Sequence, residues 1–268
     1  MVSKHLTSAF SKELVFALDI CEQAGKVAMR HWSAGVKTMS KDDGSPVTIA
    51  DTECERMIRV AIETTFPTDR MLGEEEGETK NAEADKTASK RKWIIDPIDG
   101  TYGYARGMTV FSTLLALEEN GEIILGVVSA PAANEIYWAE KGKGAWRNGQ
   151  RIEVSTCKDL SQSQFNFGGL NRIFQRGFIK AMEKIVVQTA RQRCPGDYLS
   201  FAQVFEGKAE ASLEIGVKPW DLAPMKIIIE EAGGTFSDMA GGKSIYLGDC
   251  LVTNGHLEKA FTDLLKVY

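Results

Sequence analysis

Three short segments place acidic side chains where the chain is expected to turn. Gly73-Glu74-Glu75 follows an apolar pair, Trp93-Ile-Ile-Asp-Pro-Ile-Asp-Gly-Thr101 has two aspartates after a short apolar run, and Pro219-Trp220-Asp221 begins a helical pattern. Each segment also has a purely structural explanation, because Asp-Pro and Asp-Gly are common in turns and aspartate is a preferred N-cap residue. Taken singly, none of them predicts a functional site.

Together, the three segments favour a metal site. Asp96 and Asp99 lie three positions apart where an apolar strand ends, and convergence of Glu74 and Asp221 there would gather four carboxylates. Two like charges about 4 Å apart repel by roughly 4 kcal/mol at an effective dielectric constant of 20. Such a cluster therefore requires cations or protonation. Oxygen-only ligands suit Mg²⁺, which binds through a few carboxylates, water and substrate phosphate.

These segments resemble the signature of the inositol monophosphatase family. The resemblance comprises Gly73-Glu-Glu75, Asp96-Pro-Ile-Asp-Gly-Thr101, Trp220-Asp221 with Ala223, Pro46-Val-Thr-Ile-Ala-Asp51 and Glu230-Glu-Ala-Gly-Gly234. It therefore runs along nearly the whole chain, in the right order. The family implies an α+β fold, a layered αβαβα sandwich of the inositol monophosphatase or sugar phosphatase type. It also implies a Mg²⁺-dependent phosphate monoester hydrolase with two or three metal ions.

The resemblance assigns metal ligands to single residues. It implies that Glu74, Asp96 and the backbone carbonyl of Ile98 hold one Mg²⁺, and that Asp96 bridges to a second ion bound by Asp99 and Asp221. Hydrolysis of a phosphate monoester needs an in-line water, a Lewis acid that lowers the pKa of that water, and stabilisation of the leaving oxygen; paired metals supply all three. No protein nucleophile is required, and the chain has no Gly-x-Ser-x-Gly motif.

Further roles follow from the same resemblance. Asp51 and Thr101, with Glu74, would orient and activate the attacking water, and Glu75 would support the site from behind. The N–H groups of Gly100 and Thr101 lie at an expected helix start and would bind phosphate oxygens. The implied substrate contacts are Asp99, Gly100, Thr101, Gly196, Asp197, Glu214 and Asp221.

Local features resemble the histidinol-phosphatase branch of the family. They are Thr101 to Gly107 with the following Val110 to Leu117, Gly126 to Pro131 leading to Gly144-Ala-Trp146, and Gly196-Asp-Tyr198. Histidinol phosphate carries an ammonium group and an imidazole that can become cationic, so acidic side chains at the rim would favour it over a neutral polyol. Asp197 and Glu214 are the candidates, although Asp197 could equally be the N-cap of a helix that starts near Tyr198.

Two other functions remain open. One is hydrolysis of inositol-1-phosphate or another small sugar or nucleotide monophosphate, since Tyr102-Gly-Tyr104 departs from many relatives where it would shape the pocket. The other, from a different class, is a regulatory protein that keeps the fold and binds macromolecules. Intact acidic residues at all four implied carboxylate positions, Glu74, Asp96, Asp99 and Asp221, argue against that second function.

The composition narrows the class of protein further. The 268 residues are 43% hydrophobic and 26% charged, and the net charge of −5 argues against a general nucleic-acid binder. The five cysteines are scattered, which is typical of reduced thiols in a cytosolic protein. No stretch approaches the roughly 20 apolar residues that span a membrane. We therefore expect a cytoplasmic enzyme that acts on a small phosphorylated metabolite, in histidine biosynthesis, with no nucleic-acid or membrane partner. The family adds the expectation of a homodimer.

The elements that must position these residues alternate along the chain. Helices are predicted over 6–32, 51–66, 174–187, 199–206, 222–232 and 257–267, and strands over 93–95, 111–117, 123–129, 135–139, 165–167, 209–213 and 250–253. The strands between 110 and 154 predict an antiparallel meander, and the polar residues 74–92 predict a loop. We expect helical layers around antiparallel sheets, with an N-terminal half, 1–155, and a C-terminal half, 156–268, in one compact catalytic unit.

Overall fold

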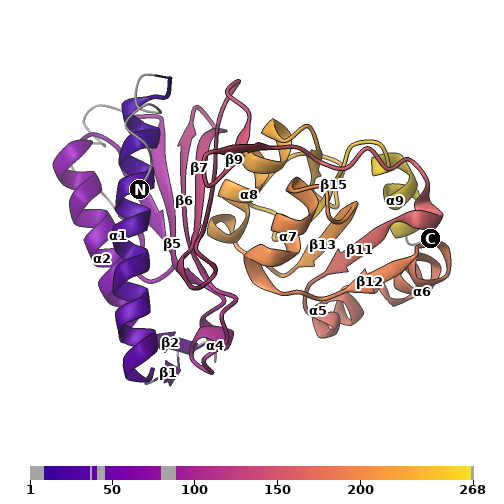
Figure 1. Cartoon of the computed structure of the whole chain (residues 1–268), viewed down its shortest axis with the longest axis horizontal. Coiled ribbons are helices and arrows are strands. Elements are labelled where there is room, and N and C mark those ends of the chain that lie inside the picture. The colour runs from indigo at the N-terminus through magenta and orange to yellow at the C-terminus, as the bar shows by residue number, and fades with distance from the viewer. Residues whose placement is uncertain (1–8, 37, 41–45, 80–88, 267–268) are drawn as a thin grey trace.

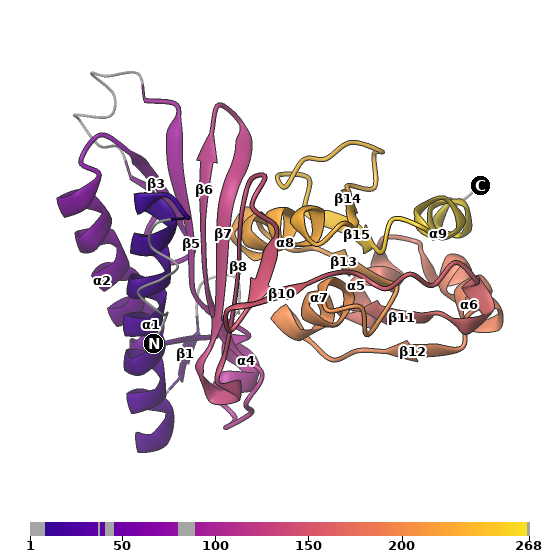
Figure 2. The ribbon, with the colours of Figure 1, turned by 45° about the horizontal axis from the view of Figure 1, so that its top comes forward.

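The computed structural model describes residues 9–36, 38–40, 46–79 and 89–266. Its layers alternate helix, sheet, helix, sheet and helix along the longest axis (Figure 1; Figure 2). The helices, from the first layer to the last, are α1 Lys12–Ala34 and α2 Ile49–Thr65, then α7 Asp197–Phe205 and α8 Pro219–Glu231, then α5 Leu170–Gln175, α6 Ile179–Gln188 and α9 Glu258–Leu265. This arrangement confirms the predicted αβαβα sandwich.

Side-chain caps start both helices of the first layer. The hydroxyl of Ser11 accepts a 3.1 Å hydrogen bond from the amide of Leu14, so α1 begins at Lys12. Thr48 and Asp51 form a reciprocal capping box, so α2 begins at Ile49, two residues before the predicted start. Asp51 is thereby fixed in the first turn of α2, facing the interior of the protein.

The larger sheet has eight strands in the order β10-β9-β8-β7-β6-β5-β3-β4. They are β3 Arg70–Gly73, β4 Gly77–Thr79, β5 Arg91–Asp99, β6 Ser112–Glu119, β7 Glu122–Ala130, β8 Glu135–Glu140, β9 Ala145–Arg147 and β10 Gln150–Ile152. The antiparallel pairing from β6 to β10 confirms the predicted meander. In contrast, β3 and β5 are parallel, so residues that follow their carboxyl ends meet at one edge of the sheet.

The polar segment 74–92 is only partly a loop, contrary to the prediction. Gly77–Thr79 forms β4, which pairs antiparallel with β3, and β5 begins at Arg91. Residues 80–88 of the predicted loop lie outside the described residues. β4 is an edge strand with one neighbour, so it can carry polar side chains and lacks the apolar pattern of a buried strand.

The smaller sheet has five strands in the order β12-β11-β13-β15-β14. They are β11 Gln164–Phe167, β12 Arg191–Arg193, β13 Ala211–Ile215, β14 Thr235–Ser237 and β15 Asp249–Thr253. β11 pairs in parallel with both β12 and β13, so the prediction of antiparallel sheets was wrong for this part. The chain passes from the larger sheet to the smaller one between Ile152 and Gln164, and the division into halves near residue 155 stays a prediction.

The last layer corrects one predicted helix. The segment predicted as a single helix over 174–187 lies in two helices, α5 and α6. Gly177 separates them with a φ of +81°, a left-handed conformation that cannot continue an α-helix. Ile173 of α5 and Met182 and Ile185 of α6 belong to one apolar cluster on the smaller sheet, so apolar spacing does not mark the break between the helices.

Three apolar clusters hold the layers together. One joins α1 and α2 to the larger sheet, the second joins both sheets to α7 and α8, and the third joins the smaller sheet to α5, α6 and α9. The middle cluster contains residues from both predicted halves, among them Leu114, Val128, Phe205 and Ile228. Among the described helices, none is both long and apolar enough to cross a membrane.

Candidate metal centre

Three aspartates meet where β5 approaches the first turn of α8. Asp96, Asp99 and Asp221 each offer a carboxylate oxygen, and these oxygens lie within 4.8 Å of one another. Two of the residues come from the end of a strand in the larger sheet, and the third comes from the helical layer between the sheets. The structure therefore brings together three of the four carboxylates that the sequence motifs suggest as metal ligands.

The end of β5 is irregular in a way that directs two aspartates to one place. Asp96 pairs with Leu114 and Asp99 with Ser112, so the register of β5 against β6 shifts between the two aspartates. Pro97 has no N–H group and cannot continue the ladder, while its carbonyl accepts a 3.0 Å hydrogen bond from the hydroxyl of Thr113. In a regular strand, side chains three positions apart point to opposite faces; the shift places both carboxylates in the same cluster.

Asp96 is the most enclosed member of the cluster. It is buried, and its Oδ1 has no hydrogen-bond partner among the described residues. Burial raises the pKa of Asp96 well above its usual range, and the carboxylates of Glu74, Asp221 and Asp99 raise it further. A buried carboxylate oxygen without a donor, among other carboxylates, fits an oxygen-ligated cation such as Mg²⁺.

Asp221 is held by the start of α8. It occupies the third position of the helix, and its Oδ2 accepts a 2.7 Å hydrogen bond from the amide of Lys218. Pro219 occupies the first helical turn, where its missing N–H costs nothing. The pKa of Asp221 is raised to about 6, chiefly by burial; the Lys218 amide opposes this rise and the Glu74 carboxylate adds to it. Asp221 is thus both a helix-capping residue and a member of the carboxylate cluster.

Glu74 lies next to this cluster, although it is not one of the three residues within 4.8 Å of each other. It follows the last residue of β3, and its amide donates a 3.2 Å hydrogen bond to the carbonyl of Ile95 in β5. Because β3 and β5 are parallel, Glu74 comes beside Asp96 at the carboxyl ends of the two strands. Its charge raises the pKa of Asp96, Asp221 and Asp51 after the larger effect of burial.

Asp51, Thr101 and Ile98 form a second group beside the cluster. The hydroxyl of Thr101 lies 2.9 Å from the carbonyl oxygen of Ile98 and 3.2 Å from Oδ1 of Asp51. The other oxygen of Asp51 accepts hydrogen bonds from the amide and the hydroxyl of Thr48, at 2.8 and 2.5 Å. Oδ1 of Asp51 therefore remains directed toward Thr101, as an oriented pair that could hold a water molecule.

Gly100 connects β5 to the short helix α4 Thr101–Tyr104. Its φ of +85° is a left-handed conformation, and a Cβ there would lie 2.9 Å from Oδ2 of Asp197. Asp197 is the first residue of α7, and the preceding Gly196 occupies the N-cap position without a side-chain hydrogen bond. The alternative of Asp197 as an N-cap was therefore wrong. Instead, its carboxylate lies against the turn that follows Asp99.

Glu214 belongs to β13, and its carboxylate lies near that of Asp197. It is 7% exposed, and its Oε1 has no hydrogen-bond partner among the described residues. The pKa of Glu214 is raised to about 8, chiefly by burial and also by the carboxylates of Asp197 and Asp221, whereas the guanidinium of Arg172 lowers it. Asp197 and Glu214 thus form an acidic border on the side of the cluster toward the smaller sheet.

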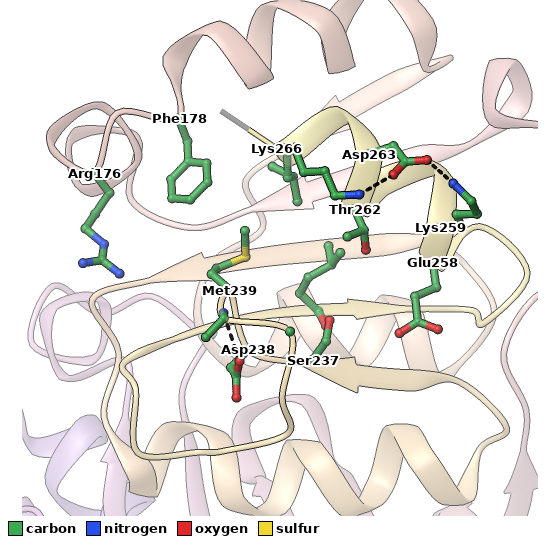
Figure 3. A pocket seen from close by; sticks show the side chains of 14 residues that line it. Arg176, Phe178, Ser237, Asp238, Met239, Glu258, Lys259, Thr262, Asp263 and Lys266 are labelled. Atoms are coloured by element: carbon green, nitrogen blue, oxygen red, sulfur yellow. Dashed lines mark hydrogen bonds and ion pairs between the residues drawn. The ribbon is translucent and has the colours of Figure 1, made fainter. Parts of the chain in front are cut away.

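A separate cavity of about 730 Å³ lies between α9 and the segment after β14 (Figure 3). Among the described residues, none of the clustered carboxylates lines it. Its basic side chains have acidic partners: Asp263 binds both Lys259 and Lys266 (Figure 3), and Arg176 binds Asp249. The side chains suited to metal-dependent hydrolysis of a phosphate ester therefore lie at the carboxylate cluster and not in this cavity.

The αβαβα sandwich and its buried cluster of oxygen ligands define a metal-dependent phosphomonoesterase. The profile of the inositol monophosphatase family matches residues 11–266, and the chain belongs to that family. The predicted fold, family and class of enzyme are confirmed.

Relatives of the chain have more than one activity. The histidinol-phosphatase of Chlorobaculum parvum is 35% identical over 242 residues, which cover 90% of this chain and 91% of that protein. The fructose-1,6-bisphosphatase/inositol-1-monophosphatase of Thermotoga maritima is 38% identical over 231 residues, 85% of each chain. The crystal structure of extragenic suppressor protein SuhB from Bartonella henselae superposes with a TM-score of 0.87 at 25% identity, and the match covers 96% of this chain and 99% of that one.

Several groups at the site carry no sequence signal of their own. The amide of Tyr198 and the hydroxyl of Ser112 donate to Asp99, and Arg172 lies near Glu214. Any residue type can supply a backbone amide such as that of Tyr198, so the sequence does not mark it. A serine in an apolar strand, such as Ser112, is expected to be an ordinary strand residue. A fourth group, Glu55 of α2, contacts the turn that carries Glu74. It reads as one half of an exposed helical ion pair with Arg59, four positions later.

Proposed function

We propose that this protein is a Mg²⁺-dependent histidinol-phosphatase that converts L-histidinol phosphate to L-histidinol and phosphate. One observation carries the choice of substrate: Asp197 and Glu214 add two acidic side chains beside the cluster of Asp96, Asp99 and Asp221. The histidinol-phosphatase of Chlorobaculum parvum supports the same choice.

The proposed metal ligands are Glu74, Asp96, the carbonyl of Ile98, Asp99 and Asp221. When bound, two or three Mg²⁺ ions would lower the pKa of a water molecule and neutralise charge on the phosphate and the leaving oxygen. The protein contributes oxygen atoms held in place before binding. Asp99 is fixed by the Tyr198 amide, Asp221 by the Lys218 amide, and Glu74 by its position beside β5.

Asp51 and Thr101 are proposed to orient the attacking water. The Thr101 hydroxyl lies between the Ile98 carbonyl and the Asp51 carboxylate, so it can donate to one of them while accepting from water. Burial raises the pKa of Asp51, whereas the hydrogen bonds from Thr48 and Thr101 lower it. A fixed carboxylate beside a hydroxyl is a geometry that can accept a proton from water.

The phosphate group is proposed to bind at the turn after Asp99. Gly100 takes the left-handed conformation there, and Thr101 begins α4. The N–H groups of these two residues are proposed donors to phosphate oxygens. Glu75 is proposed to support the turn after β3, where its amide donates to Glu55 at 2.8 Å.

The leaving alcohol is proposed to lie toward Gly196, Asp197 and Glu214. An ammonium group is attracted by carboxylates in a partly buried site, where the effective dielectric constant is well below that of water. A neutral polyol gains no such attraction. Arg172 lowers the pKa of both Asp197 and Glu214 and so favours their charged carboxylate forms.

The alternative substrate is inositol-1-phosphate or another small sugar or nucleotide monophosphate. The Thermotoga maritima relative, named for activity on fructose-1,6-bisphosphate and inositol-1-phosphate, favours this alternative. A regulatory protein that binds macromolecules is the alternative outside enzymes. The clustered aspartates weigh against it, because their mutual repulsion calls for a bound cation or for protonation, and a cation site suits a metal-dependent enzyme. The homodimer and the cytoplasmic location stay predictions, and light scattering of the purified protein would check the first.

The deciding experiment compares phosphate release from L-histidinol phosphate and inositol-1-phosphate, with Mg²⁺ or with EDTA. We expect kcat/KM to be at least about tenfold higher for histidinol phosphate, which corresponds to roughly 1.4 kcal/mol of transition-state discrimination. A preference for inositol-1-phosphate would overturn the substrate and leave the metal centre standing. No Mg²⁺-dependent release from either ester, nor from nucleotide and sugar phosphates, would favour the regulatory protein.

A further inference from the structure

A buried ion pair lies beneath the turn that carries Glu74. Glu55 and Arg59 are four positions apart on α2, with Nε of Arg59 2.8 Å from Oε1 of Glu55. Glu55 is 0% exposed and Arg59 is 4% exposed. Two charges so deeply buried destabilise a fold unless further hydrogen bonds satisfy them. The hydrogen bonds that Glu55 and Arg59 form outside the pair therefore indicate the role of the pair.

These partners are all on the hairpin formed by β3 and β4. The carboxylate of Glu55 accepts hydrogen bonds from the amides of Glu75, at 2.8 Å, and Glu76, at 3.0 Å. The guanidinium of Arg59 donates to the carbonyl of Gly77, at 2.6 Å, and to the hydroxyl of Thr79. Glu55 thus binds the turn between β3 and β4, and Arg59 binds β4.

The residue before Glu74 shows how closely the pair fits the hairpin. A Cβ at Gly73 would lie 2.2 Å from Oε1 of Glu55 and 2.7 Å from a terminal nitrogen of Arg59. No larger residue fits there without displacing the ion pair. Glu74 therefore lies between Gly73, which packs on the ion pair, and Glu75, whose amide donates to Glu55. The amide of Glu74 itself donates to the carbonyl of Ile95 in β5.

We propose that Glu55, together with Arg59, is a positioning residue for the metal centre: it fixes the turn so that the Glu74 carboxylate points at the cation before the cation binds. The inference rests on the proposed function, in which Glu74 is a metal ligand. Groups that orient metal ligands typically change metal affinity 10- to 100-fold when removed. Glu55 acts on the backbone next to the ligand, so we expect an effect near the lower end of that range.

The test is a Mg²⁺ titration of the full-length Glu55→Gln variant by calorimetry, with thermal unfolding as a check of the fold. Glutamine has the same shape but one acceptor oxygen, so one turn amide loses its partner. We expect Mg²⁺ affinity to fall about tenfold, and kcat to recover at saturating Mg²⁺. The matched control is Glu53→Gln, on the same helix, whose carboxylate is exposed and bound to Arg30 and His31; its Mg²⁺ affinity should not change.

The Glu55→Gln/Glu74→Gln double variant separates positioning from a general effect on stability. If Glu55 acts through Glu74, the double variant binds Mg²⁺ as weakly as Glu74→Gln alone, and the two effects do not add. Additive effects, or an unchanged Mg²⁺ affinity in a folded Glu55→Gln variant, would overturn the inference while the proposed function stands. An unchanged affinity in Glu74→Gln would overturn the metal assignment and this inference with it.

Arg59→Lys provides the same test if Glu55→Gln fails to fold. Lysine keeps a positive charge for Glu55 but lacks the planar group that reaches Gly77 and Thr79 at once. We expect Arg59→Lys to weaken Mg²⁺ affinity when Glu74 is present and to have no further effect in a Glu74→Gln background. A folded Arg59→Lys variant with wild-type Mg²⁺ affinity would overturn the inference.

Discussion

Oδ2 of Asp99 accepts a 2.8 Å hydrogen bond from the amide of Tyr198, a residue 99 positions later in the chain. The bond joins the end of β5 in the larger sheet to the first turn of α7 in the middle layer. The hydroxyl of Ser112 donates to the same oxygen at 3.3 Å. Asp99 therefore has a structural contact that can be separated from its proposed role as a metal ligand.

Asp99→Asn and Asp99→Ala should separate these two roles. Asparagine keeps an oxygen that can accept from the Tyr198 amide but loses the negative charge, so we expect loss of activity with little change in unfolding free energy. Alanine leaves that amide without its acceptor, which costs about 1–3 kcal/mol more. Urea unfolding in EDTA measures the difference. Equal stabilities for the two variants would show that the bond to Tyr198 contributes nothing measurable.

Asp96→Asn should abolish turnover and stabilise the metal-free protein or leave it unchanged. The substitution removes one charge from a buried cluster of like charges, and their repulsion with it. Thermal unfolding should also reveal the cation: at 100 times its Kd, Mg²⁺ adds about 2.7 kcal/mol to the wild-type protein. The variant should lack most of this gain. Wild-type activity in Asp96→Asn would refute the metal assignment.

Thr101→Val and Thr101→Ser test the proposed orientation of water. Valine has the same shape but no hydroxyl, so the Asp51 carboxylate and the Ile98 carbonyl lose a shared donor. We expect kcat to fall by about 10² or more, whereas serine should retain most of it. Stopped assays of phosphate release at saturating Mg²⁺ measure both. A valine variant as active as the serine variant would remove Thr101 from the mechanism.

Asp197→Asn should affect one substrate more than another. The substitution removes a charge beside the turn after Asp99, with little change in volume. We expect kcat/KM for histidinol phosphate to fall about tenfold, roughly 1.4 kcal/mol, and kcat/KM for inositol-1-phosphate to stay the same or rise. Equal losses on both substrates would indicate a general role in the site instead of selectivity.

Glu214 should make the stability of the metal-free protein depend on pH. Burial raises its pKa to about 8, whereas a glutamate in the unfolded chain titrates near about 4.3. Between these values the folded state binds a proton that the unfolded state has lost, so unfolding free energy falls as pH rises from about 5 to about 8. Glu214→Gln removes this contribution. In EDTA, the variant should gain stability over wild type at pH 8 relative to pH 5.5; parallel pH profiles would contradict the assignment.

The sequence predicts the residues of the candidate metal centre better than it predicts the secondary structure around them. Asp96, Asp99 and Asp221 lie in short motifs, and their convergence follows from the family fold. β4 was missed because Gly77–Thr79 has no apolar alternation; its pairing is decided by the adjacent strand β3 and by Arg59 of α2. The single helix predicted over 174–187 shows the converse, since apolar spacing continued across Gly177 although the backbone did not.

Glu55 shows why positioning groups escape sequence analysis. A glutamate and an arginine four positions apart on a helix usually form a solvated pair of small energetic effect. Only the tertiary structure shows that α2 turns this pair inward, against Gly73. Likewise, Asp197 at a helix start suggested a cap, but Gly196 takes that position and leaves the carboxylate for the site.

The separation of Asp99 and Tyr198 by 99 positions also affects the order in which the site assembles during synthesis on the ribosome. The acidic end of β5 leaves the exit tunnel long before α7 and α8 have been synthesised. Until α8 packs, the growing chain has Asp96 and Asp99 but not Asp221, so it lacks the carboxylate that completes the cluster. With Asp221 as a proposed metal ligand, we expect catalytic competence to be among the last properties the polypeptide acquires, and prematurely terminated chains that end before α8 to be inert toward phosphate esters.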